Sequence, residues 1–310
     1  MSGYRTTDVA VAGGRLRAGL WAAGRADAGR ADAGSRAAVP LLAVHGITAT
    51  HRSWDVLAER LPDADVVAPD LRGRGRSNEL PGPYGLVQHA DDLAALLDAL
   101  EIERALVVGH SMGAFVSVRL AERHPDRVAG LVLVDGGLPI PHPEGIAAEE
   151  LPGLLLGPAL ERLSMTFPDR DAYTEFWRRH PALGPYWSDA IADYVDYDVD
   201  GAEPALRSSA NPDAVAVNAL ELDGSAGYRE ALLALPGPID FFRAPRGLLD
   251  AAPLYPAELV AAWAQAAPSL RTHDVDDVNH YTIAMAERGV DAILPAIRGG
   301  LAAATRKEPA

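Results

Sequence analysis

The stretch Gly109-His110-Ser111-Met112-Gly113 lies between the apolar run Ala105-Leu106-Val107-Val108 and a segment with helical periodicity that continues to Leu120. The serine has a glycine two positions away on either side. This spacing is typical of a strand, a sharp turn and a helix packed so tightly that only residues without a Cβ fit at the glycine positions. The helix that starts there directs free N–H groups and its positive dipole end toward the hydroxyl, where an anionic intermediate would form. The pattern therefore predicts nucleophilic catalysis at Ser111.

Length and charge limit the possible classes of protein. A chain of 310 residues fits one large α/β domain with an inserted subdomain better than two independent domains. The 28 Lys and Arg residues against 43 Asp and Glu residues give a formal charge of −15, which disfavours nucleic acid or an anionic membrane as partner. The chain has no run of 18 uninterrupted apolar residues and no signal-like start, so we expect a cytoplasmic protein acting on a small molecule. The oligomeric state is left open.

Two absences from the composition exclude several chemistries. The chain has no cysteine, which rules out a thiolate nucleophile, disulfides and cysteine-ligated metals. Its only lysine, Lys307, lies in a polar tail and is poorly placed for Schiff-base or P-loop chemistry. We therefore expect no cofactor and no metal.

From residue 39 onward, apolar runs alternate with segments of helical periodicity. This alternation predicts an α/β fold with a mostly parallel central sheet and helices on both faces. Two further runs at 8–12 and 15–21, joined by Gly13-Gly14, predict a hairpin before it. The strands expected after the hairpin are 39–44, 65–68, 105–109, 128–134, 237–243 and 270–274. The expected helices are 53–60, 86–100, 112–123, 256–267 and 281–304.

Residues 138–232 interrupt this alternation with many prolines and clustered aromatic residues. We interpret them as a mainly helical lid inserted into a core made of residues 1–137 and 233–310. Aromatic clustering suits the roof of an apolar pocket, although the same residues would also suit a small core within the lid. Trp177 and Trp187 in the lid, and Trp54 in the core, are predicted substrate-binding residues.

Four short motifs follow one another along the chain: His45-Gly46-Ile47-Thr48, Asp70-Leu71-Arg72-Gly73-Arg74-Gly75-Arg76-Ser77, the serine turn, and Asn279-His280-Tyr281. In this order they resemble the α/β-hydrolase superfamily, and the resemblance covers residues 39 to 300. The arginine-glycine motif is a structural turn in that family.

The resemblance implies roles for the residues around Ser111. It implies that the backbone N–H groups of Ile47 and Met112 form an oxyanion hole, with Gly46 beside the substrate. It implies that His45 braces this turn and that His280 is the general base, following the family order of serine, acid and histidine.

The acid has two candidates, and the sequence leaves both open. Most members of the family place it after a later strand, where Asp250 follows Phe241-Phe242-Arg243-Ala244-Pro245-Arg246-Gly247-Leu248-Leu249. A minority, including haloalkane dehalogenases and some macrolactone hydrolases, place it one strand earlier, where Asp135 ends Leu131-Val132-Leu133-Val134. We prefer Asp135 because Ala244-Pro245 replaces the usual glycine turn before Asp250.

These residues predict a cofactor-free serine hydrolase that cleaves a carboxylic ester or lactone of a fairly apolar small molecule. A macrolactone such as zearalenone is one candidate substrate. Serine as nucleophile argues against the epoxide hydrolase and haloalkane dehalogenase branches, which use an aspartate. The alternatives are a C–C bond hydrolase or perhydrolase using the same triad, and a ligand receptor that keeps the fold without turnover.

Overall fold

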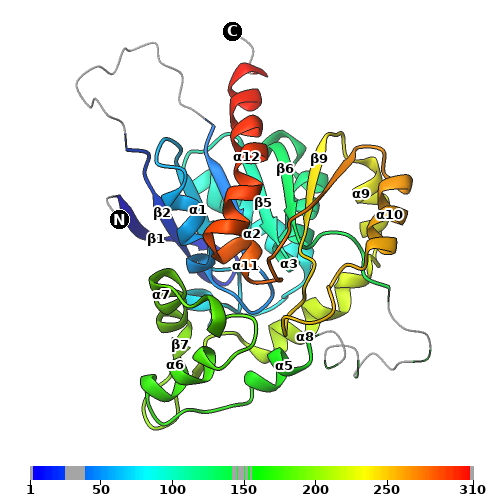
Figure 1. Cartoon of the computed structure of the whole chain (residues 1–310). Coiled ribbons are helices and arrows are strands. Elements are labelled where there is room, and N and C mark those ends of the chain that lie inside the picture. The colour runs from blue at the N-terminus through cyan, green and yellow to red at the C-terminus, as the bar shows by residue number, and fades with distance from the viewer. Residues whose placement is uncertain are drawn as a thin grey trace.

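The computed structural model describes residues 3–24, 39–141, 145, 150, 153 and 156–307. An eight-stranded sheet runs through its centre in the order β1-β2-β4-β3-β5-β6-β9-β10 (Figure 1). The strands are β1 (Tyr4–Val11), β2 (Gly14–Trp21), β3 (Leu41–Val44), β4 (Val66–Pro69), β5 (Ala105–His110), β6 (Val128–Val134), β9 (Ile239–Arg243) and β10 (Leu270–Asp274). Strand β2 pairs antiparallel with β1 and β4, and all other neighbours are parallel. The mostly parallel sheet and the N-terminal hairpin are therefore confirmed.

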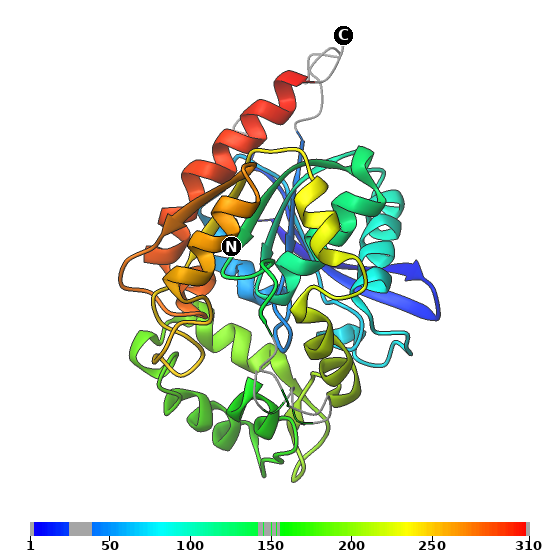
Figure 2. The same ribbon diagram turned by 90° about the vertical axis from the view of Figure 1, so that its right-hand side faces the viewer.

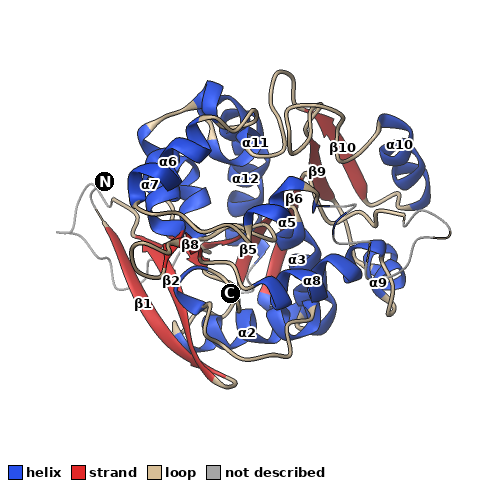
Figure 3. Ribbon diagram, turned by 90° about the horizontal axis from the view of Figure 1, so that it is seen from below, coloured by secondary structure: helices blue, strands red, loops and turns tan. Residues whose placement is uncertain are grey.

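Helices cover both faces of the sheet, and Figure 3 shows α12 on the opposite side from α2 and α3. The helices of this core are α1 (Asp55–Glu59), α2 (Leu86–Ala99), α3 (Met112–Arg123), α9 (Tyr228–Ala234), α10 (Ala257–Ala266), α11 (Thr282–Met285) and α12 (Glu287–Lys307). Short 3₁₀ turns lie at His51–Trp54, Gly75–Ser77, Pro125–Arg127, Gly184–Tyr186 and Glu221–Asp223. The apolar core accordingly forms two clusters, one under α2, α3, α9 and α10 and the other under α1, α11 and α12.

The central strands have the composition that burial on both faces requires. All four residues of β3 are apolar and fully buried, and every residue of β5 is buried. Parallel strands covered by helices on both faces are expected to be continuously apolar in this way. The predicted helix 281–304 is instead two helices, because Ala286 is extended (φ −118°, ψ 151°) between α11 and α12.

Between β6 and β9 the chain forms a separate group of helices beyond the carboxyl ends of the parallel strands, below the sheet in Figure 2. These elements are α5 (Pro158–Arg162), α6 (Arg170–Arg178), α7 (Asp189–Asp198), α8 (Pro212–Leu220) and the two-stranded β7 (Val199–Asp200) and β8 (Arg207–Ser208). Side-chain oxygens of Asp169, Ser188 and Asn211 accept hydrogen bonds from N–H groups in the first turns of α6, α7 and α8, which explains where these helices begin.

The predicted lid, residues 138–232, includes all of these elements, although residues 142–144, 146–149, 151–152 and 154–155 lie outside the described residues. Its predicted end at residue 232 falls within α9. That helix packs on α3, with the rings of Tyr228 and Phe115 5.0 Å apart. Most of α9 therefore lies with the core helices.

Within the described ranges, no helix is both long enough and apolar enough to cross a bilayer.

Candidate active site

Ser111 occupies the sharp turn between β5 and α3, with φ +54° and ψ −125°. Its N–H donates to the carbonyl of Val134 over 2.9 Å, which fixes the turn against β6. A Cβ at Gly109 would lie 2.5 Å from the carbonyl oxygen of Gly113, and one at Gly113 would lie 2.1 Å from that of Val44. Both contacts are shorter than real Cβ atoms make, so the two glycines are needed for the reason that the sequence suggested.

His280 lies at the start of the segment that leads into α11, and it is paired with a carboxylate. Its Nδ1 is 2.7 Å from Oδ2 of Asp135, and both side chains are buried. The other oxygen of Asp135 accepts a hydrogen bond from the Ala244 N–H over 3.0 Å. Asp135 itself has φ +43°, and its N–H donates to the carbonyl of Phe242. Backbone groups of β9 and of the residue that follows it thus orient the carboxylate toward His280.

Asp250, the other candidate acid, does not contact the histidine. Its Oδ1 accepts hydrogen bonds from Arg246 Nε (2.7 Å) and Asn279 Nδ2 (2.9 Å). It therefore braces the segment just before His280, while Asp135 makes the direct contact.

The turn that follows β3 lies directly beside the serine. A Cβ at Gly46 would be 3.1 Å from Ser111 Cβ and 3.6 Å from its Oγ, so this position leaves little room for a larger residue. Within the described part of the chain, the N–H groups of Ile47 and Met112 donate to no other protein atom. Both are free to hydrogen bond a ligand.

His45 is fully buried below this turn. Its Nε2 accepts from the Leu71 N–H over 2.9 Å, and its Nδ1 accordingly donates to the Gly46 carbonyl over 2.8 Å. Burial lowers the pKa of His45 to about 4, so the ring is neutral at pH 7. Its contacts are those of a brace between two loops.

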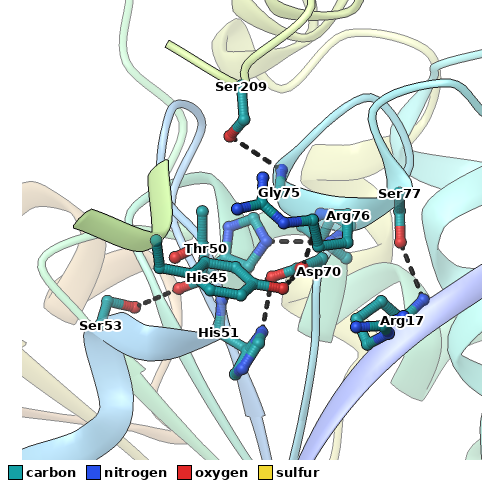
Figure 4. Close-up of polar contacts among 12 residues, drawn as sticks. Arg17, His45, Thr50, His51, Ser53, Asp70, Gly75, Arg76, Ser77 and Ser209 are labelled. Carbon is teal, nitrogen blue, oxygen red and sulfur yellow. Dashed lines mark hydrogen bonds and ion pairs between the residues drawn. The ribbon is translucent and has the colours of Figure 1, made fainter. Parts of the chain in front are cut away.

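The arginine-glycine motif forms a turn around Asp70 (Figure 4). The buried carboxylate accepts hydrogen bonds from the His51 N–H and Nδ1, the Arg76 N–H and the hydroxyl of Tyr197. Burial alone would raise its pKa, but these contacts, led by His51, hold the pKa of Asp70 well below its usual range. Gly75 is required here, because a Cβ would lie 2.3 Å from the Asp70 carboxyl carbon. These contacts agree with a structural turn.

Ser111 and His280 line one pocket, whose other walls are mostly apolar. The described residues that line it are Gly46, Ile47, Thr48, Ala49, Ser53, His110, Phe115, Ile140, Leu156, Ala159, Tyr194, Leu222, Leu248, Leu254, Tyr255, Tyr281 and Met285. Gly46 and Ile47 were predicted site residues. Most of the others come from segments far apart in the sequence, and no motif marks them.

His110 is a pocket residue that the sequence reasoning missed. Its ring lies 4.7 Å from that of His280, centroid to centroid. Its Nε2 donates to the His280 carbonyl over 2.7 Å. Its position in the serine motif, immediately before Ser111, is the sequence feature that could have identified it as a site residue. His110 thus ties the backbone of the histidine to the serine turn.

The three predicted substrate-binding tryptophans do not line this pocket. Trp54 is fully buried, with its ring perpendicular to that of His110. Trp177 is buried within the helices between β6 and β9, under the guanidinium of Arg162 at 4.7 Å. Trp187 packs against Arg178. The aromatic cluster thus forms largely an interior of its own, because aromatic rings of neighbouring short helices bury one another.

Comparison with known proteins identifies the family of this fold. Residues 39–195 match the family model described as alpha/beta hydrolase fold. Lipase LipV of Mycobacterium tuberculosis is 44% identical over 95 residues, which are 31% of this chain and 36% of the lipase. A 2-hydroxymuconate semialdehyde hydrolase of Pseudomonas sp. is 38% identical over 120 residues, 37% of this chain and 42% of that enzyme. The chain thus matches well under half the length of these relatives.

The crystal structure of E-2-(acetamidomethylene)succinate hydrolase superposes with a TM-score of 0.74 at 24% identity, covering 95% of this chain and 99% of that one. This similarity shows the fold. The match to the family model covers half of the chain, and it shows that the chain belongs to the alpha/beta hydrolase family.

Proposed function

We propose that the protein is a serine hydrolase that cleaves a carboxylic ester or lactone of an apolar small molecule through an acyl-enzyme. The observation that carries the proposal is the Asp135–His280 pair at the same pocket as Ser111. A buried carboxylate that orients a histidine, beside a serine at the start of a helix, is the arrangement that activates a hydroxyl for attack.

The hydrogen bond to Asp135 gives each group its role in this proposal. The carboxylate accepts the proton on His280 Nδ1, so Nε2 carries the free lone pair. As the Ser111 Oγ bonds to the substrate carbonyl carbon, Nε2 takes the hydroxyl proton. The carbonyl oxygen then becomes an oxyanion, and the N–H groups of Ile47 and Met112 hydrogen bond to it.

Collapse of this intermediate breaks the ester C–O bond, and His280 gives its proton to the leaving alkoxide. A water molecule then attacks the acyl-enzyme while the same nitrogen takes its proton. The second tetrahedral intermediate releases the acid and returns the proton to Ser111. Protons balance over the cycle, and one water is consumed.

The walls of the pocket support an uncharged substrate. Most of them are aliphatic or aromatic, and no arginine, lysine, aspartate or glutamate is among the described residues that line it. Removal of apolar surface from water contributes about 25 cal/mol per Å², so affinity here depends on burial. The similarity to LipV agrees with ester chemistry. Zearalenone remains one macrolactone to test.

A C–C bond hydrolase is the second candidate, and the similarity to the 2-hydroxymuconate semialdehyde hydrolase favours it. A muconate derivative carries a carboxylate, for which the described walls of the pocket offer no cationic partner. Hydrolysis of an uncharged ester or lactone therefore fits the pocket better than C–C bond hydrolysis of a carboxylate substrate. A perhydrolase using the same triad remains a third outcome for product analysis.

The proposal keeps the expectation of a cytoplasmic enzyme without a cofactor or metal, and these stay predictions. Among the described residues, no three His, Asp or Glu side chains are grouped so as to hold a metal ion.

The test is a panel of p-nitrophenyl esters from acetate to decanoate, with zearalenone and a ring-fission diketone, using the wild type, Ser111→Ala and His280→Gln. We expect turnover by the wild type only, and a KM that falls as the acyl chain lengthens. Turnover that persists in Ser111→Ala would overturn the proposal. Cleavage of the diketone alone would favour the C–C hydrolase, and a thermal shift by ligands without turnover would favour a receptor.

A further inference from the structure

Arg74 differs from every other buried arginine that the structure describes. Five arginines are buried: Arg52, Arg72, Arg74, Arg119 and Arg162. Four of them form ion pairs with carboxylates, with Asp55, Asp92, Glu122 and Asp198 respectively. Arg74 is fully buried and, among the described residues, has no carboxylate partner. A buried charge without a counterion is costly, so its retention requires an explanation.

The guanidinium of Arg74 contacts both residues that carry the proposed oxyanion-hole N–H groups. Its Nε donates to the Ile47 carbonyl over 2.9 Å. Its Nη2 lies 3.9 Å from the Met112 Sδ, and its Nη1 donates to the Arg72 carbonyl over 3.0 Å. One cation therefore contacts both residues of the proposed oxyanion hole, at the Ile47 carbonyl and at the Met112 thioether, and a planar guanidinium can make these contacts at the same time.

The groups around Arg74 leave its charge largely uncompensated. Burial lowers its own pKa to about 9 against a smaller opposing effect of Tyr84, and it remains a cation at pH 7. Burial also lowers the pKa of His45 to about 4 and that of His89 to about 3, and the Arg74 charge adds to both effects. Both imidazoles are therefore neutral at pH 7. The nearby Asp70 carboxylate is bonded to His51, Arg76 and Tyr197 instead.

We propose that Arg74 is a positioning residue of the oxyanion hole, which holds Ile47 in place and supplies an uncompensated positive charge behind the site of the oxyanion. This inference rests on the proposed function. The ester carbonyl in the ground state is nearly neutral, whereas the tetrahedral intermediate carries a full negative charge. The charge of Arg74 therefore acts mainly on the transition state, which raises kcat and leaves KM nearly unchanged.

The test compares the wild type with Arg74→Met, which removes the charge, and Arg74→Lys, which keeps it. Arg72→Lys is the matched control, because it changes a buried arginine of the same turn whose side chain bonds to Asp92, Pro81 and Ala12. The readouts are kcat and KM for one neutral ester, and the rate of inactivation by a fluorophosphonate. Circular dichroism and thermal melting check folding.

We expect Arg74→Met to lose about 10- to 100-fold in kcat and in inactivation rate, with KM changed by less than about threefold. Arg74→Lys should retain more of the rate. Its pH profile should fall at lower pH than that of the wild type, because a buried ammonium loses its proton sooner than a guanidinium. Arg72→Lys should melt earlier but keep kcat.

A folded Arg74→Met with wild-type kcat, or one in which only KM rises, would overturn the inference. If Arg74→Met does not fold, the test uses Arg74→Lys. A dependence of kcat on alkaline pH that is the same in Arg74→Lys and the wild type would also overturn the inference. Wild-type protein that neither turns over esters nor reacts with the probe would contradict the proposed function itself. A reactive wild type with an unaffected Arg74→Met contradicts only the role of Arg74.

Discussion

Substitution of Asp135 by asparagine tests the orientation of His280 directly. The two carboxylate oxygens have different donors: Oδ2 faces His280 Nδ1 at 2.7 Å, and Oδ1 accepts from the Ala244 N–H at 3.0 Å. An asparagine amide has only one accepting oxygen. If that oxygen faces His280, the amide NH₂ opposes the Ala244 N–H, and two donors face each other in a buried site.

The favoured orientation therefore turns the amide NH₂ toward His280. Nδ1 must then accept a hydrogen bond, and the imidazole proton moves to Nε2, where it blocks the removal of the Ser111 proton. Loss of the correct tautomer in this way costs about 10³- to 10⁴-fold in kcat, which corresponds to about 4–5.5 kcal/mol of transition-state stabilisation. KM should change little, because Asp135 does not line the pocket.

The assay is steady-state hydrolysis of a p-nitrophenyl ester by Asp135→Asn and Asp250→Asn, each checked for folding by circular dichroism. Asp250→Asn should keep kcat within about threefold, because Asp250 pairs with Arg246 in a partly exposed site where such pairs contribute about 1 kcal/mol or less. If kcat of Asp135→Asn stays within tenfold of the wild type, or if only Asp250→Asn loses several orders of magnitude in kcat, Asp135 is not the residue that orients His280.

Two further predictions concern stability. Gly113→Ala should lower the free energy of unfolding by about 3 kcal/mol or more, because its Cβ would lie 2.1 Å from the Val44 carbonyl oxygen. The control is Gly299→Ala, where nothing lies within 4 Å of the added Cβ and the free energy of unfolding should stay the same or rise slightly. Equal effects of the two substitutions in urea titrations would contradict the steric requirement for glycine in the turn. Burial lowers the pKa of His45 from 6.5 to about 4 and that of His89 from 6.5 to about 3. The unfolded chain therefore binds protons first, and the free energy of unfolding should fall between about pH 6.5 and pH 4 by up to about 1.4 kcal/mol per pH unit for each histidine. Identical urea midpoints at pH 7.5 and pH 5 would contradict this.

The sequence predicted the elements whose signals are local. The strands expected at 39–44 and 128–134 are apolar runs, and they correspond to β3 (Leu41–Val44) and β6 (Val128–Val134). The serine turn carries its two glycines at a spacing that steric contacts require. The break at Ala286 was missed because neither a proline nor a glycine marks it. Local periodicity predicts that a helix exists better than it predicts where the helix ends.

The contacts of the site depend on tertiary structure, which sequence spacing does not reveal. Asp135 and Asp250 both follow strands at plausible positions, and only the course of the chain after β9 puts the Ala244 N–H on Asp135 and leaves Asp250 bonded to Arg246. The aromatic residues illustrate the same limit. Trp177 has the same pattern in sequence whether it covers a ligand or packs inside the helices between β6 and β9.

Intact-mass analysis after incubation with a fluorophosphonate shows whether Ser111 is an activated nucleophile. We expect one adduct on the wild type, in which the phosphorus–oxygen bond forms as fluoride leaves, and none on Ser111→Ala. No adduct on folded wild-type protein, or the same adduct on Ser111→Ala, would contradict it.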